Sequence, residues 1–112
     1  MLGTDRTFHV EVVSVVRVAG EIDVASAPEL EKWLDTLPLG GQDVVVDLSS
    51  VTFMDSTGLG LLVGAWNRCN NSEPQSRLSL VVATPEIERL LEVAGLSDIF
   101  DRFPSLAEAA GR

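Results

Sequence analysis

The sequence is poor in the residues that build several common kinds of site. It has one cysteine, Cys69, one histidine, His9, and one lysine, Lys32, among 112 residues. A single cysteine excludes an internal disulfide and a multi-thiolate metal centre, so we expect no metal site and interpret Cys69 as a buried structural thiol. The fold must therefore be held by its hydrophobic core.

Basic charge is also scarce. Eight Lys and Arg residues stand against seventeen Asp and Glu residues, which gives a formal net charge of -9. The arginines are scattered from Arg6 to Arg112 and form no basic cluster. Phosphate-rich partners need a basic surface, so the composition argues against nucleic acid and against anionic membranes as partners.

Long apolar runs are absent. The longest nearly uninterrupted run, residues 59–66, contains two glycines and is far shorter than the roughly 20 residues that span a bilayer. Residues 1–7 are polar and do not resemble a secretory signal. We therefore expect no membrane segment and a cytoplasmic location.

The length suits a single domain. The chain has a mass of 12.0 kDa and is 46% hydrophobic, which is enough apolar material for one core and too little chain for two. We expect one domain over residues 1–112, with a flexible N-terminus over residues 1–6.

Short strands are expected in three regions. Residues 8–13 and 15–19 are rich in β-branched residues and predict two strands joined by a turn near Ser14, with one long bent strand as the alternative. Residues 43–48 predict a central strand covered on both faces, and residues 78–82 predict another strand.

Helix signals alternate with these strands. A capping box formed by Ser26 and Glu29 opens a helix that ends before Pro38, and a second, largely apolar helix begins near Ser56. Further helices begin at Thr84 and Ser105, and residues 70–77 read as an exposed polar loop. The fold class is α/β: a mixed sheet of four to five strands with about four helices packed against it.

The segment Asp55-Ser56-Thr57-Gly58 is the most suggestive chemically, because it lies where a central strand gives way to a helix. Free amides and the positive helix end there suit a phosphate. The simpler interpretation is that Asp55 or Ser56 only caps the helix. The two are compatible, because a cap at Asp55 leaves the Ser56 hydroxyl available.

The sequence lacks the residues and motifs that common enzyme mechanisms require. The only histidine, His9, is in the first predicted strand, and Ser56 has no G-x-S-x-G context. No P-loop motif is present, and Gly58, Gly60 and Gly64 are better explained by helix packing than by dinucleotide binding. Taken without the Ser56 motif, Glu21 and Asp23 are interpreted as solvated turn residues. We expect no catalytic residues and no cofactor.

Two longer blocks carry a family resemblance: residues 20–28, GEIDVASAP, and residues 46–60, VDLSSVTFMDSTGLG. Together with residues 94–96, AGL, they resemble the signature blocks of the STAS-domain anti-sigma-factor antagonists in order and spacing. The similarity covers nearly the whole chain and implies a single STAS-like domain.

The resemblance implies a partner-switching cycle in transcription regulation, of the kind used in stress response or sporulation. Ser56 matches the family's phosphorylation site. The unphosphorylated protein is expected to bind an anti-sigma factor that is also a serine kinase and so to free a sigma factor. Phosphorylation of Ser56 ends that binding, and a serine phosphatase restores it. The expected partner-facing neighbourhood is Asp23, Asp55, Thr57, Gly58 and Leu59.

Two other functions are alternatives to this switch. A STAS scaffold or small-ligand sensor would bind partners or a ligand through the same fold without using Ser56 as a switch. A small hydrolase with Ser56 as its nucleophile is the third hypothesis, and the missing histidine neighbour counts against it.

Overall fold

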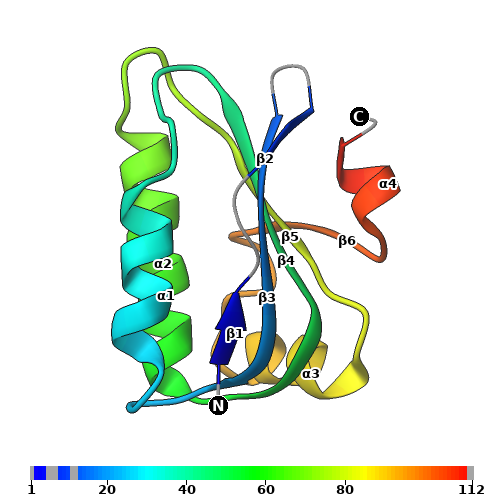
Figure 1. The fold of residues 1–112 in the computed structure, drawn as a ribbon. Coiled ribbons are helices and arrows are strands. Elements are labelled where there is room, and N and C mark those ends of the chain that lie inside the picture. Colours follow the sequence, from blue (N-terminus) through cyan, green and yellow to red (C-terminus); the bar gives the residue numbers. More distant parts are fainter. Residues whose placement is uncertain (1, 5–7, 11–12, 111–112) are drawn as a thin grey trace.

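The fold is described from a computed structural model, which covers residues 2–4, 8–10 and 13–110 (Figure 1). In chain order the elements are β1 (Leu2–Thr4), β2 (Phe8–Val10), β3 (Val13–Ile22), α1 (Ala27–Asp35), β4 (Asp43–Met54), α2 (Ser56–Asn70), β5 (Leu78–Val81), α3 (Pro85–Val93), β6 (Asp101–Phe103) and α4 (Leu106–Ala110).

The strands form one mixed sheet in the order β1-β3-β4-β5-β6, and β2 also pairs with β3. Strands β3, β4, β5 and β6 are parallel, whereas β1 and β2 run antiparallel to β3. The predicted mixed α/β fold is confirmed, but the sheet has six strands where we expected four to five. The short strands β1 and β6 lack the β-branched, alternating pattern that reveals a strand in sequence.

The N-terminal region differs from the expectation in two ways. Leu2–Thr4, part of the segment expected to be flexible, pairs with β3 as β1. Ser14 lies inside β3, opposite His9 of β2, so the turn predicted near Ser14 is wrong, as is the single bent strand. The connection falls at residues 11–12, which lie outside the described residues.

Helices cover both faces of the sheet. Figure 1 shows α1 and α2 side by side along one face, α4 against the other, and α3 across one end. The expectation of about four helices is confirmed. Over the part of the chain that the structure describes, no helix is long and apolar enough to cross a bilayer.

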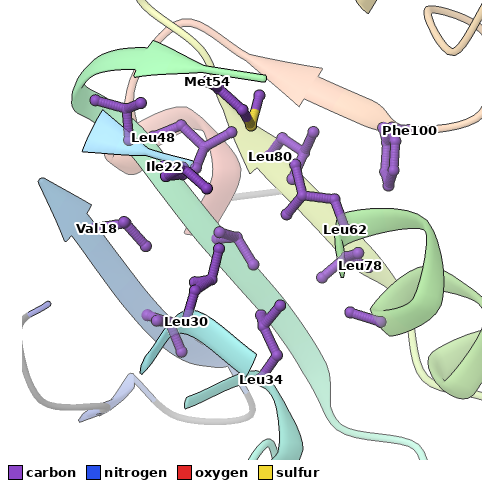
Figure 2. Close-up of a cluster of buried hydrophobic side chains, with 14 of the residues drawn as sticks. Val18, Ile22, Leu30, Leu34, Leu48, Met54, Leu62, Leu78, Leu80 and Phe100 are labelled. Atoms are coloured by element: carbon purple, nitrogen blue, oxygen red, sulfur yellow. The ribbon is translucent and has the colours of Figure 1, made fainter. Parts of the chain in front are cut away.

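The pleat of β4 separates two apolar clusters. Val44, Val46 and Leu48 face the main core under the helices, part of which is shown in Figure 2. Val45 points the other way and packs with residues of β3, β5 and α4 in a second, smaller cluster. Since successive side chains of a strand alternate between faces, the consecutive apolar run of β4 reflects burial on both sides, as predicted.

The cluster under α4 generates a test of stability. Ala109 in α4 is buried with Val15, Val45 and Val81, whereas Ala107 is exposed. Ala109→Asp places a charge in an apolar contact and is expected to cost about 2 kcal/mol of unfolding free energy, measured by urea denaturation. Ala107→Asp carries the same charge and should change stability by under about 0.5 kcal/mol. Equal urea midpoints for the two variants would contradict this packing.

Candidate functional site

The site lies at the carboxyl ends of β3 and β4, where hydrogen bonds hold the two strands together. Ile22 pairs with Met54 at the end of the two parallel strands. The Asp55 amide then donates a hydrogen bond of 3.2 Å to the Ile22 carbonyl. Because of this bond, the turn that follows β3 and the start of α2 lie beside each other at one edge of the sheet (Figure 1).

Asp55 is the N-cap of α2. Its backbone is extended, and its Oδ1 atom accepts a 2.9 Å hydrogen bond from the Thr57 amide. Ser56 is the first residue of the helix and is exposed, and its hydroxyl has no hydrogen-bond partner among the described residues. The cap and the free hydroxyl therefore occur together, so Ser56 is accessible beside unpaired amides of a helix N-terminus.

Asp23 begins the other half of the site. Helix α1 starts directly after Ser26, as predicted, but the predicted capping box of Ser26 and Glu29 is not formed by the Ser26 side chain. The Ser26 amide donates to Asp23 Oδ1 at 3.0 Å, and the Asp23 amide donates to Ser26 Oγ at 2.9 Å. This reciprocal pair is a capping box that starts at Asp23, one turn before the box predicted from Ser26 and Glu29. Ser26 itself has helical backbone angles and makes no side-chain cap bond to α1. A residue already in helical conformation cannot turn its hydroxyl back to the following amides.

These hydrogen bonds stabilise the Asp23 carboxylate in its charged form. They hold the pKa of Asp23 below its ordinary value of 3.8, with the Ser26 amide as the largest cause and burial acting in the opposite direction. A side chain that was expected to face a partner is therefore also the residue that orders the turn before α1.

Gly58 and Leu59, which we expected among the partner-facing residues, are buried. A Cβ atom on Gly58 would lie 2.6 Å from Met54 Cγ and 2.7 Å from Ile22 Cγ2, so any side chain at this position would force Met54 or Ile22 to shift. Gly58 confirms the prediction that glycine serves close packing. Gly60 and Gly64 do not, because a Cβ there meets nothing closer than 3.9 Å.

Two exposed apolar residues flank the site. Val24, in the turn after Asp23, is 73% exposed, and Phe53, near the end of β4, is 48% exposed. Phe53 pairs with Glu21 across the strands, while its neighbour Met54 is buried. The sequence pattern does not decide whether Phe53 lies in the core or on the surface, and it does not single out Val24. The one signal for Val24 was an apolar residue within a polar turn.

The charge at this edge has one sign. Residues 19–31 and 50–66, which supply the site, include Glu21, Asp23 and Asp55 but no lysine or arginine. An added phosphate would find hydrogen-bond donors in the first turn of α2 and no cationic side chain within these two segments.

The sheet keeps the only histidine away from Ser56. His9 pairs with Ser14 near the start of β3, and Ser56 follows the far end of the neighbouring strand β4. Eight residues of strand separate Ser14 from Ile22, about 26 Å at 3.3 Å per residue. Among the described side chains, no three of His, Cys, Asp and Glu gather as metal ligands would.

Comparison with known proteins identifies the fold's family. The STAS domain model matches residues 6–109. The chain belongs to the STAS domain family. It is 41% identical over 85 residues to the anti-sigma-B factor antagonist of Staphylococcus aureus, covering 75% of this chain and 77% of that protein.

Solved STAS structures agree with this assignment. An anti-sigma factor antagonist from Mycobacterium paratuberculosis superimposes with a TM-score of 0.84 at 30% identity, covering 99% of this chain and 92% of that one. The Bacillus cell fate determinant SpoIIAA, solved in its phosphorylated form, shares the fold with a TM-score of 0.70 at 19% identity, covering 100% of this chain and 98% of that one.

The packing of Gly58 leads to a matched pair of substitutions. Gly58→Ala forces Met54 and Ile22 to shift and should lower the unfolding free energy by about 1 to 2 kcal/mol, even though alanine favours the helix. Gly60→Ala enters open space on the same helix and should be neutral or raise stability by up to about 1 kcal/mol. Thermal and urea unfolding of both variants measure the difference, and a stabilised Gly58→Ala protein would refute the close approach.

The Asp23 capping box predicts a pH effect. Because the folded pKa of Asp23 is lowered, its contribution to stability is complete above the unfolded pKa near 3.9 and is lost as the pH falls through the lower folded pKa. Ser26→Ala removes the hydroxyl that accepts from the Asp23 amide and donates to the Asp23 carboxylate. The substitution should therefore raise the Asp23 pKa toward 3.8. Carboxyl ¹³C NMR titration measures the Asp23 pKa in the wild type and in Ser26→Ala, with the Asp55 carboxyl as the internal control. An unchanged Asp23 pKa in Ser26→Ala would show that the hydroxyl has no part in it.

Proposed function

We propose that this protein is an anti-sigma-factor antagonist whose binding is switched off by phosphorylation of Ser56. The observation that carries the proposal is the exposed Ser56 hydroxyl at the start of α2, beside an Asp55 side chain that is already occupied as the cap. The 41% identity to the S. aureus antagonist supports the role, and the phosphorylated SpoIIAA shows that a protein of this fold accepts a phosphate.

The partner-facing surface in this proposal contains Asp23, Asp55 and Thr57 around Ser56. Gly58 and Leu59 are buried and pack beneath this surface without being part of it. Val24 and Phe53 add apolar area to the same edge. Apolar residues at the centre of an interface contribute much of its binding energy, so these two belong to the proposed contact.

A phosphate on Ser56 changes this surface without a change of fold. It adds a charge of about -1.5 to -2 in segments that hold acidic side chains and no basic one. It also fills volume that a docked partner would need. A coupling of 1 to 3 kcal/mol between phosphate and partner changes affinity roughly 5- to 150-fold, which is enough for a switch.

The cycle requires partners of three kinds. The unphosphorylated protein binds an anti-sigma factor with serine kinase activity and so releases a sigma factor. The kinase phosphorylates Ser56, and a serine phosphatase reverses the modification. In this cycle the protein is a substrate and binding module with no catalytic residue or cofactor of its own, and it acts in the cytoplasm, where transcription takes place.

Variants of Ser56 test the switch. Tagged wild-type, Ser56→Ala, Ser56→Asp and Thr57→Ala proteins are expressed in the native cells, and the co-purified anti-sigma factor is quantified by mass spectrometry. We expect Ser56→Ala to retain the anti-sigma factor at least as well as the wild type, and Ser56→Asp to recover at least about tenfold less, because the carboxylate imitates part of the phosphate charge.

Phosphopeptide mapping of the same samples locates the phosphate. Phosphate on Ser56 in the wild type and in Thr57→Ala, with none in Ser56→Ala, is the expected pattern. Equal recovery of the anti-sigma factor by Ser56→Ala and Ser56→Asp, with Ser56 unmodified, would favour the scaffold or ligand-sensor function instead.

A further inference from the structure

A cleft of about 430 Å³ lies at the other end of α2 from Ser56. The C-terminal part of α2, the loop before β5, the start of β4 and the approach to β6 all line it. Trp66, one of its lining residues, is ten residues from Ser56 along α2, about 15 Å at 1.5 Å per residue. The volume is in the range of pockets that hold small organic ligands, and the cleft is separate from the proposed switch.

The charged groups of the cleft do not balance. Arg77 Nε donates a 2.8 Å hydrogen bond to Asp101 Oδ2, so these two lining residues neutralise each other. The third charged lining residue, Asp43, is half-buried, and its carboxylate has no hydrogen bond or ion pair among the described residues. The formal charges of these three lining residues sum to -1, in a chain whose net charge of -9 already attracts cations.

Two of the lining side chains are large and apolar. Trp66 is half-buried and lines the cleft together with Ile99, which is 37% exposed. An aliphatic or aromatic group that covers these side chains removes apolar area from water, which is favourable. An indole face also attracts a cationic group through its quadrupole.

Hydrogen bonds hold the walls in place. The Ser76 amide donates to Ser72 Oγ at 2.9 Å, and Ser76 Oγ accepts from the Gly41 amide at 3.1 Å. The Val44 amide donates to the Arg77 carbonyl at 2.8 Å, which ties the loop to β4. Burial raises the pKa of the lining Cys69 thiol, so it stays neutral and leaves the charge of the cleft unchanged. These bonds fix the loop that carries Ser76 and Arg77 against the start of β4, which reduces the cost of ordering that part of the cleft on binding.

We propose that this cleft binds a small organic cation, an ammonium or amidinium group on an apolar or aromatic skeleton, with Asp43 as its counter-charge and Trp66 and Ile99 as its apolar wall. A protonated amine supplies the donors that the Asp43 carboxylate lacks. The proposal does not depend on the function of Ser56, because its test needs neither kinase nor anti-sigma factor.

The test uses 2-phenylethylamine as the cationic probe and 3-phenylpropionate as a probe with the same ring and the opposite charge. Titration of the full chain, followed by ¹H-¹⁵N NMR, should show saturable millimolar binding of the amine, with shifts at the indole N–H of Trp66 and the amides of Asn70 and Ser76. Trp33 in α1, outside the cleft, is the internal control and should not shift.

Paired variants separate the site from general charge attraction. Asp43→Asn should weaken binding of the amine about tenfold, whereas Glu31→Gln, which removes one negative charge from an exposed position on α1, should leave it within about twofold. Equal binding of amine and carboxylate, shifts centred on Ser56, equal effects of the two variants, or no shift at 10 mM amine (a concentration roughly tenfold above millimolar affinity) would each overturn the proposal.

Discussion

The close contact of Gly58 with the ends of β3 and β4 is the constraint on which the functional edge depends. Met54 and Ile22 occupy the space where a side chain would stand, and the bond from the Asp55 amide to the Ile22 carbonyl joins the same two strands. The turn with Asp23 and the helix start with Ser56 are therefore positioned by one piece of core packing. Interiors packed this densely transmit small shifts, so a change at Gly58 is expected to affect both halves of the site.

Helix α2 connects two surfaces of different chemistry. Its first turn displays Ser56 at an acidic edge that also carries exposed Val24 and Phe53. Its last turns line a cleft that also includes Trp66 and Asp43, whose carboxylate has no partner within the part of the chain that the structure describes. One end suits a protein partner and a covalent phosphate, and the other suits a small cation. The division follows from an apolar helix that is buried in the middle and meets solvent at both ends.

Local signals predicted the elements well where one residue determines the geometry. Asp55 was considered as a cap because an extended aspartate before a helix accepts from a first-turn amide, and it does so. Ser26 precedes α1 as predicted, but its side chain makes no cap bond to the helix, because its hydroxyl and amide are paired with Asp23 three residues earlier. The sequence of strand β6 has no β-strand pattern. It forms a strand because it pairs with the edge of the sheet at β5.

The sequence by itself determined the α/β alternation, the family, Ser56 as the candidate site and the central place of β4, because periodicity, caps and motifs are local properties of the chain. Only the tertiary structure decided which neighbours of Ser56 reach the surface: Gly58 and Leu59 are buried, whereas Val24 and Phe53 are exposed. It alone brought Asp43 and Trp66, from distant parts of the chain, to the lining of one cleft. Exposure and proximity depend on how distant segments pack, and no short stretch of sequence encodes that packing.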